Sequence, residues 1–321
     1  MAYRLKDSEA LPDGIKRIVL EQIDRALDRL KPKTRNKDRA IHEGRVCFKK
    51  IRAVLRLVRT EIGDELFALE NAEYRDAGRS LSAVRDTAVV AETLKTVLQH
   101  SARQLAGSDL KALRKRLSLS RVEQQLDRNE VLVEVAEVLR VARNRVGTWP
   151  LESKDFSALG EGLRRVYKHG LGGFESVRRD ASTEGFHQWR KQVKHLLYEI
   201  SILNPLWPKM LDVLNRELNR LSDYLSEDHD LALLRERALE QAKALGDLTD
   251  IEGLIRLIDL RRVRLQTRAI ALGGRLYSEK PNAFVERLQS YWEVWHSTGT
   301  IDSVDAPASN TASYQASASI L

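Results

Sequence analysis

Two stretches of this sequence carry the same pattern of basic side chains. Residues 42–50 read HEGRVCFKK and residues 187–195 read HQWRKQVKH, so that histidine, arginine and lysine stand at relative positions 0, 3 and 7 in both. These side chains donate hydrogen bonds and carry positive charge, and the planar fork of arginine suits phosphate and carboxylate groups. The chemistry that this pattern predicts is therefore the binding of an anion.

Helical geometry gathers the cations of the first stretch on one side. At about 100° per residue the basic residues share one arc of about 100°, and apolar residues fill the opposite side. The arc contains His42, Arg45, Lys49, Arg52, Arg56 and Arg59. Exposed helices usually mix acids and bases, because such pairs stabilise a helix, so a purely cationic stripe predicts an anionic ligand or partner. A solvated basic face that is neutralised by acids elsewhere in the fold is the alternative.

The second stretch forms a similar stripe on its own predicted helix. His187, Arg190, Lys191, Lys194 and Tyr198 lie on one side, opposite Trp189 and Val193. The stripe is shorter than the first one, because His195-Leu196-Leu197 stands where the first stretch has Lys50-Ile51-Arg52. Two such helices predict a pair that faces each other across a pseudo-twofold axis.

A second shared signal supports an internal repeat. Arg85-Asp86 begins 43 residues after His42, and His229-Asp230 begins 42 residues after His187. We expect the two aspartates to hold basic side chains in position, with helix capping as the alternative. His229-Asp230 is also the signature pair of metal-dependent phosphohydrolases, which need further ligands, for which His187 or His195 and Asp259 are the candidates. Arg85 occupies the equivalent place in the first half and is a poor neighbour for a metal, so we expect no metal site.

Further cations could support the two stripes. We expect supporting roles for Arg75, Arg79, Arg85, Arg216, Arg220, Arg261 and Arg264.

The composition predicts the helices that must position these residues. The chain has 321 residues with only 17 glycines and 7 prolines, and 54 Lys+Arg against 46 Asp+Glu give a net charge of +8. So few helix breakers predict an all-α protein. Its single cysteine, Cys47, excludes an intramolecular disulfide framework and lies on the apolar side of its helix.

Several function classes lack their usual signals. The sequence contains no glycine-rich phosphate loop and no nucleophile elbow. It has no apolar run approaching the ~20 residues of a membrane span, and no secretory leader is visible at Met1 to Gly14. We expect a cytoplasmic, noncatalytic protein without a cofactor or membrane partner.

Apolar periodicity and breakers divide the chain into two halves and a tail. The first half covers about 1–147 and ends at Gly147-Thr-Trp-Pro150; the second covers about 156–297; residues 298–321 are predicted to be a disordered tail. Predicted helices cover about 13–30, 38–61, 64–100, 108–146, 156–169, 182–203, 209–245, 249–277 and 281–295. Gly170, Gly172 and Gly173 are expected to break the first helix of the second half.

These motifs together resemble the conserved histidine α-helical domain, the CHAD domain. The features that carry the resemblance are H-x-x-R-x-x-x-K-K-x-R at His42–Arg52, H-x-x-R-K-x-x-K at His187–Lys194, the two dipeptides ending in Asp86 and Asp230, and the closing stretch Leu276–Phe284 before Tyr291-Trp292. The resemblance covers nearly the whole chain, up to about residue 296. The resemblance implies two four-helix bundles, related by pseudo-twofold symmetry, around a basic central groove or pore.

The resemblance also implies a ligand, inorganic polyphosphate, and association with polyphosphate granules in bacteria. It implies a ligand-binding set of His42, Arg45, Lys49, Lys50, Arg52, Arg56, His187, Arg190, Lys191 and Lys194. Phosphate or sulfate ions are expected to suit the same site. The alternatives are nonspecific nucleic-acid binding through the same surface and a metal-dependent phosphohydrolase. The tryptophans form no visible platform for base stacking, which counts against nucleic acid.

Overall fold

The structure is a computed structural model that describes residues 3–31, 34, 36–83, 90, 92–97, 128–245 and 249–302. Every regular element in those ranges is a helix, which confirms the predicted all-α class. The first half contains α1 (Leu11–Arg29), α2 (Lys37–Leu57), α3 (Arg59–Ile62), α4 (Asp64–Ala83) and α7 (Arg128–Val146). The second half contains α8 (Ser157–Arg179), α9 (Thr183–Leu203), the 3-10 turn η1 (Asn204–Leu206), α10 (Pro208–Leu245), α11 (Thr249–Leu276) and α12 (Pro281–Asp302).

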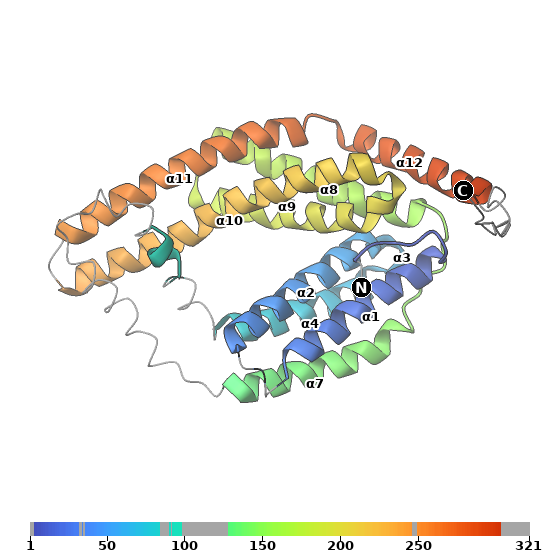
Figure 1. Cartoon of the computed structure of the whole chain (residues 1–321), viewed down its shortest axis with the longest axis horizontal. Coiled ribbons are helices and arrows are strands. Elements are labelled where there is room, and N and C mark those ends of the chain that lie inside the picture. Colours follow the sequence, from blue (N-terminus) through green and yellow to red (C-terminus); the bar gives the residue numbers. More distant parts are fainter. Residues whose placement is uncertain are drawn as a thin grey trace, which may run out of the picture.

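The helices of each half lie together (Figure 1). In the first half α1 and α4 pack on α2, and α7 packs on α1; in the second half α8 and α10 pack on α9, and α12 packs on α8. This matching order of contacts is what an internal repeat predicts, and the repeat itself stays a prediction. The two halves meet where α2 contacts α8 and α9. The main apolar core includes buried residues from both halves.

Local signals begin and end the two helices that carry the basic motifs. The Asn36 side chain accepts a hydrogen bond from the backbone N–H of Arg39 and caps α2. Ser182 caps α9 in the same way, by accepting from Gly185 N–H at 3.2 Å. Such N-caps satisfy backbone donors that a helix leaves unpaired. Gly63, at φ 80°, ends the run that began at α2, as the sequence predicted.

The predicted break at the glycines of the second half is wrong, because α8 runs unbroken through all three. These glycines provide space rather than flexibility. A Cβ on Gly170 would lie 2.5 Å from the hydroxyl oxygen of Tyr277, and one on Gly173 would lie 2.9 Å from Trp189 Cδ1. The missing side chains therefore let buried aromatic rings pack against the helix backbone.

The end of the second half also differs from the prediction. Helix α12 continues to Asp302, beyond the expected end near Trp295, and the rest of the predicted tail lies outside the described residues. A smaller apolar cluster joins the halves elsewhere: Val90 and Leu94 pack with Leu234 of α10 and with Leu254 and Ile258 of α11. Among the described helices, none is long and apolar enough to cross a membrane.

Candidate functional site

The basic stripe of the first half lies on α2 as the helical wheel predicted, except for Arg59, which begins α3 and pairs with Asp64 at 2.6 Å. Phe48, Ile51 and Leu55 are buried on the opposite side, and Cys47 is buried with them. His42 is exposed, whereas the remaining members of the stripe are half-buried. We call His42, Arg45, Lys49, Arg52 and Arg56 the α2 stripe.

The C-terminal part of the α2 stripe is held by a neutral group. Arg52 Nε donates to the Asn71 side-chain oxygen at 3.0 Å, and an Arg56 guanidinium N–H donates to the same oxygen at 3.2 Å. Arg56 also donates to the backbone carbonyl of Arg52 at 2.7 Å. Burial, together with the charge of Arg52, lowers the pKa of Arg56 to about 10. These contacts orient two guanidinium groups without neutralising either of them.

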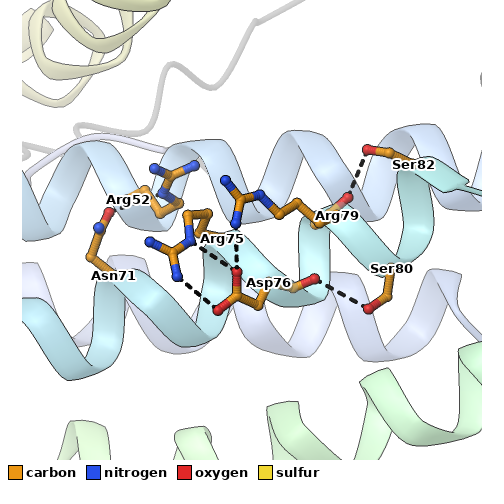
Figure 2. A network of polar contacts seen from close by, with 8 residues as sticks. Arg52, Asn71, Arg75, Asp76, Arg79, Ser80 and Ser82 are labelled. Atoms are coloured by element: carbon orange, nitrogen blue, oxygen red, sulfur yellow. Dashed lines mark hydrogen bonds and ion pairs between the residues drawn. The ribbon is translucent and has the colours of Figure 1, made fainter.

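Helix α4 adds the predicted supporting arginines beside Arg52. Figure 2 shows Arg75 and Arg79 arranged around one carboxylate, Asp76. Arg75 donates to both oxygens of Asp76, at 2.9 Å each. The pKa of Arg52 is lowered by burial and then by the charges of Arg75 and Arg79. Two α4 cations therefore share one acid and still raise the positive potential at the α2 stripe.

The second stripe lies on α9 and is backed by α10. We call His187, Arg190, Lys191 and Lys194 the α9 stripe. Arg190 Nε donates to the Ser226 hydroxyl of α10 at 3.1 Å. Burial and the nearby Arg190 charge lower the pKa of Lys194 to about 8, although Asp223 and Asp230 oppose this shift. Burial lowers the pKa of Arg190 as well, and the Asp230 charge again opposes the shift. Asp230 thus acts on two α9 cations.

A histidine pair closes one end of the α9 stripe. The Nδ1 atoms of His187 and His229 lie 3.1 Å apart, with the ring centroids 4.4 Å apart. One ring must therefore accept the hydrogen bond through an unprotonated nitrogen. Burial and the surrounding cations, which include Lys49 of the α2 stripe, lower the pKa of His229 to about 3. At neutral pH this pair offers polar donors and acceptors but little charge.

His195 connects the two stripes electrostatically. It belongs to α9, and burial lowers its pKa strongly, followed by the charges of Arg56, Arg52 and Lys49 on α2. Its Nδ1 is buried without a hydrogen-bond partner among the described residues. Helix α2 packs on α9, and cations of both helices lower the pKa of His229, so the two stripes lie within electrostatic range of each other. We call the two stripes together the α2–α9 face.

Two predicted residues, Lys50 of the ligand-binding set and Tyr198 of the supporting set, contact Tyr3 of the N-terminal segment. Lys50 Nζ lies 4.5 Å from the ring centroid of Tyr3, and its backbone carbonyl accepts from the Tyr3 hydroxyl at 2.8 Å. It therefore packs on the N-terminal segment, on another side of α2 from the stripe. Tyr198 packs edge-on against the same Tyr3 ring, at 6.3 Å between centroids, and the Arg190 charge acts on its hydroxyl.

The other predicted supporting residues lie on α10 and α11, where Arg261 and Arg264 line a pocket together with Asp230. Arg216 lines a depression further along α9, with Ser201, and Arg220 lines a separate pocket on the α11 side of α10. Arg261 donates to Glu227 of α10 at 2.7 Å, and Arg264 lies one turn further along α11. The proposed equivalents of His229 and Asp230, Arg85 and Asp86, lie outside the described residues.

Of the residues of the metal hypothesis, His187 and His229 lie together, but Asp259 does not join them. Among the described residues no group of three or more His, Cys, Asp or Glu side chains could hold a metal ion. Asp259, the further carboxylate ligand that the sequence offered, is paired with Arg235 at 2.8 Å instead.

Several residues that shape the site could not be identified from the sequence. Asn71 and Ser226 are neutral partners of arginines, and no spacing rule selects them. His169 of α8 lies near the end of the α2 stripe, since its pKa is lowered by burial and then by Arg165, Lys168 and Arg56. Asp223 stands seven residues before Asp230, on the same side of α10, and that spacing is the one signal that could have identified it.

Comparisons with known proteins agree with this fold. A family model of the CHAD domain matches residues 17–239. The chain therefore belongs to the CHAD-domain family. Its fold is similar to the crystal structure of the CHAD domain from the plant Ricinus communis, with a TM-score of 0.54, 18% identity, and coverage of 84% of this chain and 88% of that chain. No curated protein matches this sequence.

Proposed function

We propose that this protein binds inorganic polyphosphate on the α2–α9 face, without catalysing a reaction. The observation that carries the proposal is the clustering of cations on two helices that pack together. In each cluster burial comes first, and neighbouring cations then add to it, in lowering the pKa of Arg52 and Arg56 on α2 and of Lys194 on α9. Like charges held this close, and partly removed from water, favour an anion that would neutralise them. Membership of the CHAD-domain family supports the same ligand.

Polyphosphate suits the chemistry of this face. It is a flexible polyanion that carries no bases, so a binder needs repeated phosphate donors and little else. Arg56 stands 14 positions after His42, so the α2 stripe is about 21 Å long at 1.5 Å per residue. Arginine forks and lysine ammonium groups along that length would contact successive phosphates. The His187–His229 pair would add neutral hydrogen-bond donors at one end.

The proposal also predicts the physical character of binding. Neutralisation of a polyanion releases its condensed counterions, so the affinity should fall steeply with salt, as it does for nucleic-acid backbones. A protein that holds polyphosphate in this way would associate with polyphosphate granules.

Isothermal titration with medium-chain polyphosphate tests the proposal. The variant Arg45→Ala/Lys49→Ala/Arg190→Ala/Lys194→Ala removes cations from both stripes, and circular dichroism checks that it folds. Duplex DNA at matched salt is the parallel ligand. The proposal expects tight polyphosphate binding, weaker DNA binding and a large loss in the folded variant. Equal affinity for DNA, or unchanged polyphosphate binding in the variant, would contradict it.

A further inference from the structure

A second concentration of arginine lies on the other side of α10 from the α9 stripe. A pocket of about 350 Å³ opens between α10 and α11. Helix α10 contributes Glu217, Arg220 and Tyr224, and helix α11 contributes Arg268 and Arg275. This volume falls at the lower end of the range typical of small-molecule sites.

The charges around this pocket are unbalanced. Among the described residues that line it, Glu217 is the one acid, and its carboxylate lies 3.9 Å from the Arg220 guanidinium, a long ion-pair distance. Arg220 Nε donates instead to the Tyr224 hydroxyl at 2.9 Å. The side chains of Arg268 and Arg275 form no hydrogen bond or ion pair with any described residue, and the Arg275 backbone carbonyl accepts from the Ser278 hydroxyl at 3.0 Å. Three guanidinium groups therefore surround one pocket with a single acid between them.

The spacing on α11 explains why its two arginines share the pocket. Arg268 and Arg275 are seven residues apart, so they lie on the same side of the helix, about 10 Å apart along its axis. Ala271 and Leu272 stand between them and line the pocket with apolar surface. Arg220 approaches from the opposite wall. This arrangement offers separate guanidinium groups for an anion and an apolar wall beside it.

Acidic residues separate this pocket from the α2–α9 face. Asp223 of α10 acts on Lys194 of the α9 stripe, and Glu227, one turn further along α10, pairs with Arg261 of α11. A polyanion that crossed α10 would meet these carboxylates. The pocket is for this reason a distinct site and not a continuation of the α2–α9 face. The residues that match the CHAD-domain model end at 239, before the two α11 arginines.

We propose that this pocket binds the phosphate groups of a small phosphorylated ligand through Arg220, Arg268 and Arg275. Arginine is suited to bidentate contacts with phosphate oxygens, and two unpaired guanidinium groups lose no existing ion pair on binding. Two sources of the same chemistry are a short inorganic oligophosphate and a nucleotide. In the second case Leu272 and the Tyr224 ring would contact the organic part.

Arginine footprinting and calorimetry test this site in the full-length chain. Tripolyphosphate and ATP are the probes, and phenylglyoxal modification followed by mass spectrometry reports the protection of each arginine. The variant Arg268→Ala/Arg275→Ala is compared with Arg237→Ala/Arg256→Ala, which removes the same charge from α10 and α11 away from the pocket. Both arginines of the test variant are exposed, so we expect it to fold.

The proposal expects protection of Arg268 and Arg275 by at least one probe. It also expects the test variant to lose one molar equivalent of that probe, or to bind it at least about tenfold more weakly, while the control variant binds normally. Protection by both probes assigns recognition to the phosphates alone, whereas protection by ATP alone adds a role for the organic part. Unchanged labelling with both probes, or equal binding by the two variants, would overturn the proposal. Neither result depends on the α2–α9 face, whose residues stay intact in both variants.

Discussion

The α2 and α9 stripes carry the same motif but differ in how the protein holds their cations. On α2, Arg52 and Arg56 are oriented by the Asn71 amide and a backbone carbonyl, which are neutral groups. On α9, the cations lie within the field of two α10 carboxylates, Asp223 and Asp230. Carboxylates act on both stripes, since Asp76 acts on Arg52 and Glu199 acts on Arg56. The stripes differ in their neighbours: α2 has the neutral Asn71 amide beside its two guanidinium groups, and α9 has two α10 carboxylates beside Lys194.

Two helices with the same motif therefore need not contribute equally to binding. A ligand that reaches the α9 stripe must compete with fixed acids, but it meets no such acid at Asn71. The α9 stripe instead gains a property that α2 lacks, because Lys194 has a pKa of about 8 and so titrates close to neutral pH. We expect α2 to provide most of the affinity and α9 to provide its pH dependence.

The largest expected effect comes from removing Arg52 and Arg56, the pair that the Asn71 amide orients on α2. The variant Arg52→Ala/Arg56→Ala should bind polyphosphate about 100-fold more weakly or worse, since each charged hydrogen bond contributes about 1.5–3 kcal/mol. The slope of log affinity against log salt should also fall by about 2. Titrations at several salt concentrations measure both quantities.

Arg140→Ala/Arg143→Ala is the matched control for that variant. It removes the same charge from α7, where Arg140 pairs with Glu137 and Arg143 pairs with Asp24 on the exposed surface. If the control weakened binding as much as the test variant, net charge rather than the α2 stripe would explain the affinity.

A smaller effect is expected from pH. Burial lowers the pKa of Lys194 to about 8, and a bound polyanion would raise it again. Below pH 8 Lys194 is charged with or without the ligand; above pH 8 binding must take up a proton, so the affinity falls as pH rises. From pH 7 to pH 9 we expect a loss of about tenfold, measured by titration in buffers of equal ionic strength. Lys194→Arg should remove most of this dependence, and a variant that kept it would assign the effect to another group.

The smallest expected effect tests the compensation itself. Asp223→Asn removes one acid that acts on Lys194, so polyphosphate should bind about threefold more tightly at neutral pH, in keeping with the modest energies of partly solvated charge pairs. Asp155→Asn, an exposed acid before α8, makes the same change in net charge elsewhere. Weaker binding by Asp223→Asn, or an equal gain in both variants, would show that Asp223 does not compete with the ligand.

Sequence periodicity predicted the helices and the α2 stripe well, because both depend on local spacing. The apolar residues opposite His42 and Lys49 are buried as the wheel required, and Gly63 ends the segment. Local spacing could not predict that Gly170 lies inside an unbroken helix. A glycine that breaks a helix and one that admits an aromatic ring look identical until the position of Tyr277 is known.

The residues around the two stripes were predicted less well, because their positions depend on packing between distant segments of the chain. Arg75 and Arg79 lie beside Arg52 as expected, whereas Lys50 packs on Tyr3, which is 47 residues away in the sequence. Arg220 and Arg261 are on the α11 side of α10, since the rotation of α10 and α11 decides which arginines share a surface. Composition could identify these residues as cations but could not assign them to a site.

A crystal structure of the protein with polyphosphate is the most direct test of whether the ligand binds on the α2–α9 face. We expect a chain of phosphate density along this face, with phosphate oxygens contacting Arg52 and Arg56 of α2 and Arg190 or Lys194 of α9. Phosphate density confined to other surfaces, with both stripes in contact only with solvent, would contradict it.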